Sequence, residues 1–475
     1  MASDDRAEIS FSLDGERLSG HASDTLASAL LRRGVTTFTR SIKYHRPRGP
    51  FCFAGSCGQC LVRVDGVPSV PACRVPLREG MACERQNAPA GADTDFFRAV
   101  DFLFPGRLDH HHLMVQSRLL GRVALEVARR LSGLGTLPAE TRTAVPGAAR
   151  ETQIAVVGAG PAGLAAAREA LQAGARVVLL ERDAQAGGAA LLGIGPSGPG
   201  ADAVAAEARA VVQAGGELML DAEVVGLYAA QEGASPLLAV REGARLTALR
   251  AERVIVATGG TSQPFPFSGV DRPGVYAARG LIGLSLRNGL LVSAGGATPQ
   301  RAPRLAVVGV GRELVDCARA LRSRGYALAR VVDAGDTEDA IDPADPALEG
   351  LPVVRGQPLR ARGNPVVELQ IEAGGAVEKV PCDAVALAFP QAPLHDLASS
   401  VGVGAPFHAR LNGFPIETSE GGRTKVPWLY AAGTAAGAGG VRAQVSGAAA
   451  GRAAAHDLAV ARSAGGAGRD PRGGA

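Results

Sequence analysis

Four cysteines in one short stretch of the chain have the spacing of an iron–sulfur site. Cys52, Cys57 and Cys60 follow one another as C-x4-C-x2-C, and Cys73 comes after a further twelve residues. Plant-type [2Fe–2S] clusters use four thiolates at this spacing. The glycines of the loop would allow the unusual backbone angles that wrapping a cluster needs. The sequence therefore predicts a [2Fe–2S] cluster bound by these four cysteines.

Zinc and disulfides are the alternative interpretations of these cysteines. A structural zinc site usually pairs two C-x2-C knuckles, whereas this stretch has one such pair and a cysteine that stands apart from it. Disulfide frameworks are typical of short secreted chains, and this chain has 475 residues with seven cysteines. Three histidines at 110–112 are adjacent, so a regular element cannot direct all of them at one metal. The spacing favours the cluster.

A glycine-rich turn between a strand and a helix indicates a dinucleotide-binding fold. A buried strand is expected at 153–157, then Gly158-Ala-Gly160-Pro161-Ala162-Gly163, then a helix at 164–173. Gly158 would make the tight turn, Gly160 would let a pyrophosphate approach the backbone, and Gly163 would pack the helix on the strand. The next strand ends in Glu181. Its carboxylate would accept hydrogen bonds from the adenosine ribose and disfavour a 2′-phosphate.

Three later segments accompany this turn: a glycine pair at 187–188, a strand and turn at 253–259, and a final strand at 426–434. Together they resemble flavoproteins of the glutathione-reductase type over residues 152 to about 460. FAD is the expected cofactor. NAD is an alternative at the same site, because this chain has Gly433-Thr434 where most such flavoproteins have Gly-Asp. The expected cofactor-binding residues are Gly158, Gly160, Pro161, Ala162, Gly163, Glu181, Arg182, Gly188, Val224, Ala257, Thr258, Gly259, Gly433 and Thr434.

A second turn of this type, at Gly309-Val-Gly311, is degenerate. Leu314 replaces its third glycine, and Arg312 and Glu313 crowd the approach to the backbone. We therefore expect this domain to serve as a scaffold and docking surface. Asp333, at the end of the following strand, would suit NAD rather than NADP if a nucleotide bound there.

The predicted fold is α/β. A hairpin at 8–18, a helix at 26–33, the cluster loop and a second hairpin follow the order of a β-grasp ferredoxin-like domain, and two Rossmann-like domains of the glutathione-reductase type come after it. The expected domains are the ferredoxin-like domain at 1–88, a helical bridge and linker at 89–150, the first part of the dinucleotide-binding domain at 151–285, the inserted second Rossmann-like domain at 286–390, the second part of the dinucleotide-binding domain at 391–462, and a disordered tail at 463–475.

Charge and hydropathy exclude some classes of function. The net charge of +4 is small for this length and gives no argument for nucleic-acid binding. The charged N-terminus has no apolar region of a signal peptide, and no uncharged apolar window of transmembrane length occurs, so we expect a cytoplasmic protein. Basic side chains between Arg40 and Arg48 precede the cluster. They would raise the potential of an anionic cluster, hold a flavin phosphate or meet an acidic partner, and a solvated loop is the alternative.

The string Ser-Ile-Lys-Tyr-His-Arg-Pro-Arg-Gly at 41–49, followed by the four cysteines and Pro-Leu-Arg-Glu-Gly-Met at 76–81, is more specific. It resembles the alpha subunits of heterotetrameric sarcosine oxidases and their relatives: opine oxidases, hydrogen cyanide synthase and multi-subunit proline and hydroxyproline dehydrogenases. The resemblance implies a flavin-dependent amine-oxidising beta subunit as partner, further small subunits, and an FMN at the interface with the beta subunit. It also implies that the cluster groups this chain with the dehydrogenases.

Three functional hypotheses follow. The first is an electron-transfer subunit of a flavin-dependent amine or amino-acid dehydrogenase or oxidase. The second is an NAD(P)H-dependent iron–sulfur flavoprotein reductase, and the third is a non-catalytic scaffold subunit that binds NAD. No cysteine pair lies next to the first glycine-rich turn, and no Ser–His–Asp set or carboxylate pair can be identified from spacing. We therefore expect no substrate-handling catalytic residue in this chain.

Overall fold

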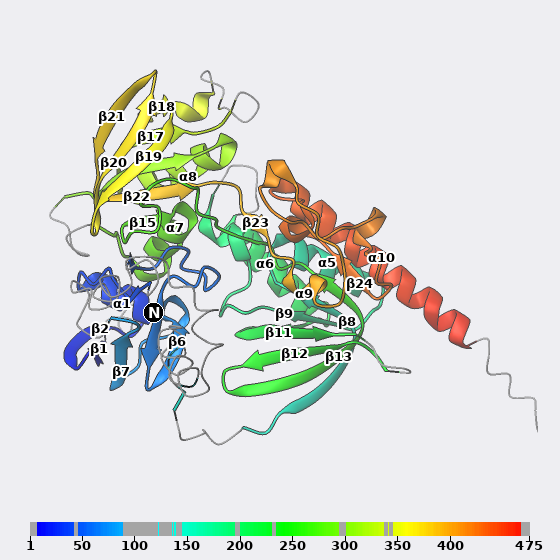
Figure 1. Cartoon of the computed structure of the whole chain (residues 1–475). Helices are drawn as coiled ribbons and strands as arrows, with labels where there is room; N and C mark the ends of the chain where they lie inside the picture. Colours follow the sequence, from blue (N-terminus) through cyan, green and yellow to red (C-terminus); the bar gives the residue numbers. More distant parts are fainter. Residues whose placement is uncertain are drawn as a thin grey trace, which may run out of the picture. The chain divides into compact units, whose positions relative to one another are not determined.

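The protein divides into two compact units of mixed α/β structure. The computed structural model describes residues 7–41, 46–88, 145–194, 200–229, 234–293, 301–336 and 345–466, together with positions 122, 135, 137, 138 and 341. Unit 1 comprises Met1–Thr141 and Ser262–Phe389, and unit 2 comprises Arg142–Thr261 and Pro390–Ala475. Each unit is therefore assembled from two separate stretches of the chain, which the colours of Figure 1 distinguish.

The N-terminal part of unit 1 is a sheet with one helix on it, in the β-grasp arrangement. Its described strands have the order β2-β1-β7-β5-β6, and β1 pairs antiparallel with β2 and parallel with β7. The Thr25 side chain accepts from the Ser28 amide and so caps the helix, which confirms the predicted helix start. The elements are β1 (Glu8–Leu13), β2 (Glu16–His21), α1 (Leu26–Arg32), β3 (Thr39–Arg40), β4 (Pro47–Arg48), β5 (Leu61–Val64), β6 (Val67–Pro71), η1 (Ala72–Arg74) and β7 (Met81–Arg85).

The second part of unit 1 is the inserted domain, built on a parallel sheet. Its described strands have the order β15-β22-β16-β17-β18, and β19, β20 and β21 form an antiparallel sheet that packs on the same core. The elements are β15 (Val275–Ala277), α7 (Ala278–Asn288), β16 (Arg304–Gly309), α8 (Gly311–Ser323), β17 (Ala327–Asp333), η3 (Pro346–Leu348), β18 (Val353–Arg355), β19 (Gln357–Gly363), β20 (Val366–Ala373), β21 (Ala376–Pro381) and β22 (Ala384–Ala388).

The boundaries of the inserted domain and of the C-terminal helix differ from those expected. We expected the inserted domain to begin at 286, but β15 pairs with β22, so the chain from Ser262 onward belongs to it. A short buried parallel strand carries no alternating pattern that would assign it to one sheet or another. At the C-terminus, helix continues to Gly466, past the expected end at 462. The predicted bridge at 89–150 lies mostly outside the described residues.

Unit 2 is the larger Rossmann-like domain. Its sheet has the order β10-β9-β8-β13-β12-β11, and β24 pairs with β13. The strands β10, β9, β8, β13 and β24 are parallel, whereas β13, β12 and β11 form an antiparallel meander. The elements are β8 (Ala148–Val157), α5 (Pro161–Gln172), β9 (Val177–Leu180), η2 (Gly188–Leu192), α6 (Ala201–Gln213), β10 (Glu217–Met219), β11 (Ala222–Tyr228), β12 (Leu237–Glu242), β13 (Arg245–Val256), β14 (Gly260–Thr261), β23 (Ala392–Pro393), α9 (Asp396–Ser399), η4 (Ala409–Leu411), η5 (Glu420–Gly422), β24 (Leu429–Ala431), η6 (Gly433–Ala436) and α10 (Val441–Gly466).

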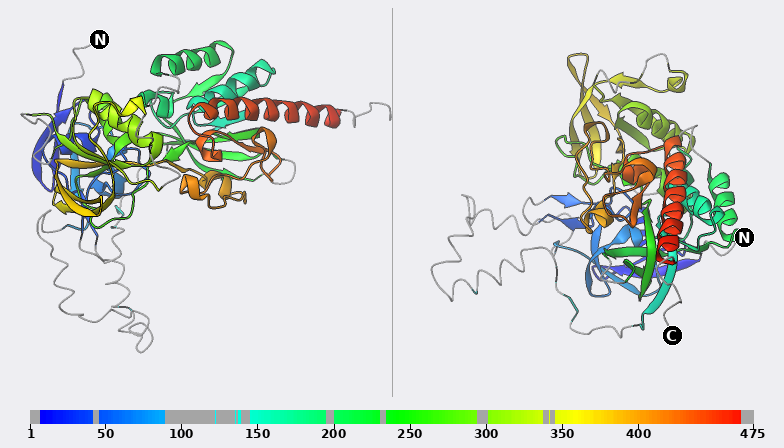
Figure 2. Two further views of the ribbon diagram at one scale, coloured as in Figure 1. Left: turned by 90° about the horizontal axis from the view of Figure 1, so that it is seen from above. Right: turned by 90° about the vertical axis from the view of Figure 1, so that its right-hand side faces the viewer.

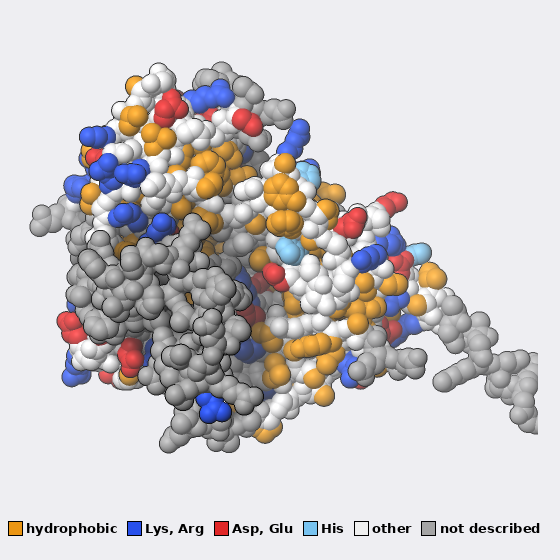
Figure 3. All heavy atoms as spheres, viewed as in Figure 1, with side chains coloured by type: hydrophobic (Ala, Val, Ile, Leu, Met, Phe, Trp, Pro, Cys, Tyr) orange, Lys and Arg blue, Asp and Glu red, His pale blue; other side chains and the backbone are white. Residues whose placement is uncertain are grey.

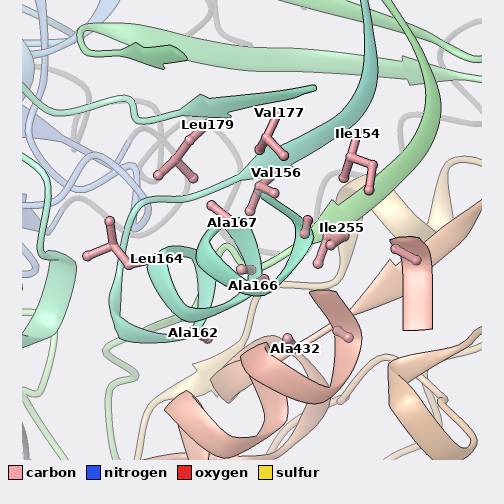
Figure 4. Close-up of a cluster of buried hydrophobic side chains, with 14 of the residues drawn as sticks. Ile154, Val156, Ala162, Leu164, Ala166, Ala167, Val177, Leu179, Ile255 and Ala432 are labelled. Atoms are coloured by element: carbon pink, nitrogen blue, oxygen red, sulfur yellow. The ribbon is translucent and has the colours of Figure 1, made fainter. Parts of the chain in front are cut away.

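Helix α5 is held between the sheet and α10. Aliphatic side chains of β8, β9 and β13, among them Ile154 and Ile255, pack on its sheet side (Figure 4). On its other side, an ideal Cβ on Gly447 would lie 2.0 Å from the Ala162 carbonyl oxygen, so only glycine permits this approach. Figure 2 shows α10 in red along unit 2. This packing fixes the N-terminus of α5, where a dinucleotide would bind. No helix in the described part of the chain is long and apolar enough to cross a membrane.

Candidate cluster and dinucleotide sites

The loop at 51–60 carries three of the four predicted cluster ligands, and β5 and β6 return the chain to the fourth. Cys73 lies in η1, directly after β6, as the predicted hairpin requires. Cys57 is half-buried and the other three cysteines are buried. Gly55 and Gly58 have φ angles of 77° and 63°, which residues with a side chain rarely adopt. The backbone therefore folds the loop back on itself and brings its cysteines together.

The four thiols interact with one another, and Cys52 and Cys73 each interact with two of the others. Cys57 donates a hydrogen bond to Cys52, and Cys73 donates to both Cys60 and Cys52. The bonds from Cys57 and Cys73 hold the pKa of Cys52 far below its usual range, and the bond from Cys73 lowers the pKa of Cys60. A [2Fe–2S] cluster takes four thiolates, two on each iron. The mutual contacts of the four thiols fit a set of ligands to one such cluster.

A single metal ion fits this donor set less well. Within the described ranges, no three His, Cys, Asp or Glu side chains converge as ligands of one ion. Tetrahedral zinc would need four sulfurs about 2.3 Å from one point, whereas a two-iron cluster distributes them over two. All seven cysteines are free thiols, so no disulfide competes for them. The histidines at 110–112 lie outside the described residues.

Two further groups of the loop are directed at the sulfur of Cys52. The Ala54 amide donates to it at 3.4 Å, and the Ser56 hydroxyl donates at 3.6 Å. Hydrogen bonds to a ligand sulfur stabilise the extra negative charge of a reduced cluster and raise its reduction potential. The loop thus supplies both ligands and groups that tune them.

The basic segment before the loop is only partly described. Arg40 is buried in β3, and Arg46, whose side chain is 59% exposed, pairs with Asp271 of the inserted domain at 3.0 Å. Lys43 and His45 lie outside the described residues. One of the predicted tuning or partner-binding cations therefore contacts the inserted domain of the same unit.

The glycine-rich turn in unit 2 has the geometry that a pyrophosphate requires. Gly158 has φ of 102°, and an ideal Cβ on it would lie 2.5 Å from the Ala257 carbonyl oxygen. A Cβ on Gly163 would lie 1.8 Å from the Gly158 carbonyl oxygen, but a Cβ on Gly160 would have no neighbour within 4 Å. Helix α5 begins at Pro161 without a side-chain cap or an acidic residue in its first turn. Open space and uncapped amides thus meet where phosphates would bind.

Glu181 lies beside this turn. Its side chain is buried, and its carboxylate accepts from the Ala159 amide at 2.9 Å and the Asp183 amide at 3.0 Å. Burial raises the pKa of Glu181, and the two amide bonds oppose that rise. Each carboxylate oxygen retains a further lone pair, so Glu181 can still accept from ribose hydroxyls. Arg182 follows it and is half-buried.

Most of the other predicted cofactor residues surround the N-terminus of α5. An ideal Cβ on Gly188 would lie 3.2 Å from the Gly160 Cα, and one on Gly433 would lie 2.8 Å from the Ala162 Cβ. The Ala257 amide donates to the Val157 carbonyl at 2.8 Å, which brings the end of β13 to the end of β8. These contacts bring three separate segments of unit 2 to one turn.

Thr258 also lies against the turn, since an ideal Cβ on Gly158 would lie 3.4 Å from the Thr258 Cα. Gly259, Thr434 and Val224 complete the predicted set. The Thr258 hydroxyl donates to the Leu394 carbonyl at 3.0 Å, and Gly259 follows it. Thr434 lies in η6 beside Gly433. Val224 lies on β11, whose first residue donates to the Glu181 carbonyl at 2.8 Å. Sequence reasoning missed Ser446, whose hydroxyl accepts from the Gly433 amide at 3.2 Å. Nothing in the alanine-rich sequence of α10 singles that serine out.

The second glycine-rich turn, in the inserted domain, is closed. Glu313 lies in the first turn of α8 and accepts two hydrogen bonds from Arg279, at 2.6 and 2.7 Å. Leu314 is fully buried where a third glycine would stand. Both carboxylate oxygens of Asp333 accept from backbone amides, at 3.1 and 3.0 Å. A carboxylate thus occupies the helix start that a phosphate would need.

Two families of known domains match the chain. Residues 152–455 match the pyridine nucleotide-disulphide oxidoreductase family, and residues 6–88 match the 2Fe-2S iron-sulfur cluster binding domain. The fold and the sites thus define an oxidoreductase that joins an iron–sulfur domain to a dinucleotide-binding core. The chain belongs to the pyridine nucleotide-disulphide oxidoreductase family. These matches support a [2Fe–2S] cluster and FAD as its cofactors.

The resemblance to sarcosine oxidase alpha subunits is confirmed. The chain is 29% identical over 420 residues to that subunit from Rhizobium meliloti, which covers 83% of this chain and 41% of the relative. It is 30% identical over 297 residues to the subunit from Corynebacterium sp. strain P-1, which covers 58% of this chain and 26% of that relative. Hydrogen cyanide synthase subunit HcnA from Pseudomonas aeruginosa is 32% identical over 82 residues, which covers 17% of this chain and 78% of that subunit. The chain spans less than half the length of these sarcosine oxidase subunits.

Solved structures share the fold. L-proline dehydrogenase from P. horikoshii superposes with a TM-score of 0.64 at 18% identity, covering 98% of this chain and 75% of that one. Lactococcus lactis thioredoxin reductase superposes with a TM-score of 0.53 at 18% identity, covering 65% of this chain and 99% of that one. At this identity the likeness shows the fold alone, and it confirms the predicted fold class.

Proposed function

We propose that the chain is the electron-transfer subunit of a multi-subunit, flavin-dependent amine or amino-acid dehydrogenase or oxidase. The substrate of the whole enzyme is of the sarcosine, proline, hydroxyproline or opine type. A partner flavoprotein oxidises the C–N bond, and this chain takes up the electrons and passes them to an acceptor. No residue of this chain acts on the amine.

One observation carries the proposal: the chain has sites for two electron carriers, but it has no cysteine pair for disulfide chemistry. Of its seven cysteines, four are the predicted cluster ligands. Cys317 and Cys382 are buried in the inserted domain, and burial raises the pKa of the Cys382 thiol to about 12. Cys83 is buried on β7, and burial raises its pKa to about 12 as well. Burial therefore disfavours the thiolate, which is the reactive form, at Cys83 and Cys382.

The residues around α5 would bind and orient FAD. The open space at Gly160 and the amides of the first helical turn would receive the pyrophosphate, and Glu181 would accept from the ribose. Thr434 offers a hydroxyl where related flavoproteins offer a carboxylate, so it would make a neutral hydrogen bond to the cofactor. When bound, a flavin can accept an electron pair and release it one electron at a time, which matches a one-electron cluster.

The proposed partners are a flavin-dependent amine-oxidising beta subunit and further small subunits, with an FMN held at the interface with the beta subunit. Similarity to sarcosine oxidase alpha subunits, which are parts of a larger enzyme by name, supports such partners. We place the complex in the cytoplasm, where reducing conditions suit free thiols and an iron–sulfur site.

Purification of the full chain with its natural partners tests the proposal. The expected preparation contains a second, flavoprotein-sized chain, and denaturation releases FAD from the alpha subunit in preference to NAD. Anaerobic addition of NADH to the isolated chain should leave the flavin absorption unchanged. Rapid bleaching of the flavin by NADH would favour a self-sufficient reductase instead. Release of NAD alone, with no flavin, would favour a scaffold subunit.

A further inference from the structure

The inserted domain buries one side of the cluster loop. Phe51 and Cys52 belong to the same buried hydrophobic cluster as Val275, Ala277 and Val308 of that domain. Ala54 and Cys57 are partly buried against the same cluster. A predicted cluster ligand therefore lies within the core of a domain that comes much later in the sequence.

The contact is made by the first turn of α7. The Ala277 amide donates to the Phe51 carbonyl at 3.0 Å. An ideal Cβ on Gly280 would lie 2.9 Å from the Cys52 carbonyl oxygen and 2.9 Å from the Phe53 ring. The Phe53 ring also lies 5.9 Å from that of Tyr276. No side chain fits between this helix and the ligand loop.

Phe53 shows that the contact constrains the loop. Its φ of 52° is in the left-handed region, which costs a residue with a bulky side chain of the order of 1 kcal/mol or more. Its side chain is only 6% exposed. The packing of Phe53 on β15 and α7 is what offsets that cost. A loop without the inserted domain would lose this support.

Both ends of α7 are fixed within unit 1. At its C-terminal end, the Asn288 side chain donates to the Ser23 carbonyl at 3.0 Å, and Arg32 of α1 donates to the Asn288 carbonyl. At its N-terminal end, Arg279 forms the two-bond ion pair with Glu313. The helix is therefore held to the cluster domain at one end and to α8 at the other.

The other side of the loop is open. Gly55, Ser56 and Gly58 are exposed. Solvent thus reaches the loop and its half-buried Cys57 from that side, whereas α7 covers the side of Cys52. On the face of the molecule shown in Figure 3, charged and hydrophobic side chains are interspersed over the described surface.

We propose that the inserted domain is the cap of the iron–sulfur cluster rather than a second nucleotide-binding domain. The first turn of α7 holds the loop in its ligand-bearing shape and excludes water from the Cys52 side. Arg279 and Glu313 close the vacant nucleotide turn and fix α7 in position. Solvent access is one of the factors that set the potential and lifetime of such clusters. This role rests on the cluster alone and not on any partner subunit.

Two glycines of α7 make a matched test. Gly280→Ala adds a methyl group that meets the Cys52 carbonyl and the Phe53 ring, whereas Gly283→Ala, one turn later, meets only the flexible end of Arg287. Both changes favour helix formation equally. In the full chain, we expect Gly280→Ala to lose its cluster to an iron chelator roughly tenfold faster than wild type, because overpacking displaces the loop. The Gly283→Ala variant should lose it at the wild-type rate.

The cluster's midpoint potential and the content of bound dinucleotide complete the experiment. Gly280→Ala should shift the potential and leave the dinucleotide content unchanged. Equal chelation rates and potentials in the two variants would overturn the proposal. Hydrogen exchange of the wild-type chain tests it without a substitution. Removing the cluster should increase exchange at 277–283 but not in α8, and unchanged exchange at 277–283 would also overturn it.

Discussion

The Ala159 amide donates a hydrogen bond of 2.9 Å to Oε2 of Glu181, which ties the glycine-rich turn to the acidic residue at the end of the next strand. The Asp183 amide holds the other carboxylate oxygen at 3.0 Å. The carboxylate is therefore positioned before any nucleotide arrives. A ligand that accepts this arrangement does not have to order the side chain, which lowers the entropic cost of binding.

Replacing this carboxylate should weaken dinucleotide binding. We expect Glu181→Ala to reduce the affinity by about 1–3 kcal/mol, the usual range for a lost charged hydrogen bond. Glu181→Gln keeps one acceptor oxygen, so its affinity for the dinucleotide should lie between those of Glu181→Ala and wild type. Reconstitution of the stripped protein with FAD, followed by fluorescence, measures both affinities. An affinity for Glu181→Ala equal to that of wild type would show that the ribose is bound elsewhere.

A branched side chain at Gly160 should empty the dinucleotide site without unfolding the domain. The φ of Gly160 is −74° and a Cβ there meets no protein atom within 4 Å, so the backbone accepts a side chain where the pyrophosphate would lie. Gly200 has φ of −67° and equally open surroundings, which makes Gly200→Val a matched control. We expect denatured Gly160→Val protein to release no FAD or NAD, while its cluster absorption and melting temperature match those of the control.

That variant also tests the second glycine-rich turn. Because Arg279 and Glu313 close that turn, the loss of the first site should leave the chain without any bound nucleotide. A remaining equivalent of NAD in Gly160→Val protein would contradict the assignment of the inserted domain as a cap.

Loss of one thiol at the open side of the loop should remove the cluster. Cys57→Ser should abolish the cluster absorption at roughly 400–600 nm, the range expected of such a centre, and leave the flavin bands. Cys83, also in the N-terminal domain but outside the loop, provides the control. Cys83→Ala should keep the cluster spectrum. A Cys57→Ser spectrum that matches wild type would refute the ligand assignment.

The two candidate sites could be predicted from local patterns, whereas contacts between distant stretches could not. The C-x4-C-x2-C run and the turn at 158–163 are contiguous, so spacing alone located both. The contact of Gly280 with Cys52 joins two stretches that are distant in the sequence. The residue pattern of neither stretch predicts that it contacts the other. The ion pair of Arg279 with Glu313 was likewise unforeseen. Glu313 alone indicated only a crowded turn, because the partner of a charged side chain cannot be read from its own sequence neighbours.

The end of α10 should make stability depend on pH. Asp457 accepts from Arg423 at 2.8 and 2.9 Å and from the Tyr430 hydroxyl at 2.8 Å. The bond from Arg423 holds the pKa of Asp457 well below its ordinary value of 3.8. A carboxyl group with a lowered pKa contributes stability above its unfolded pKa and loses it as the pH falls. The contribution should therefore be complete at neutral pH and disappear in acid.

Urea unfolding of Asp457→Asn measures this contribution. We expect the variant to be about 1–2 kcal/mol less stable than wild type at pH 7. The difference should shrink as the pH falls through 3.8, where Asp457 is half protonated in the unfolded chain. Glu252 pairs with Arg462 near the exposed end of the same helix. Glu252→Gln, the control, should cost less than about 1 kcal/mol, as exposed ion pairs do. A difference for Asp457→Asn that is independent of pH would rule out the ion pair as its cause.

The basic segment before the cluster should contribute to binding of the partner subunit. Lys43, Arg46 and Arg48 lie in the segment that resembles the sarcosine oxidase alpha subunits, and the Arg46 side chain is 59% exposed despite its pair with Asp271. Replacing all three with Ala should weaken complex formation about tenfold, because cations steer and hold an acidic partner. The affinity of the variant for the partner should also depend less on salt concentration than that of wild type. The cluster spectrum should not change. Replacement of Arg209, Arg245 and Arg250 on unit 2 removes the same charge and should leave the complex intact.

Turnover by the isolated chain tests the subunit hypothesis itself. The isolated wild-type chain should not oxidise sarcosine, proline or an opine with an artificial acceptor. Turnover by that chain at the rate of the full complex would refute the subunit hypothesis.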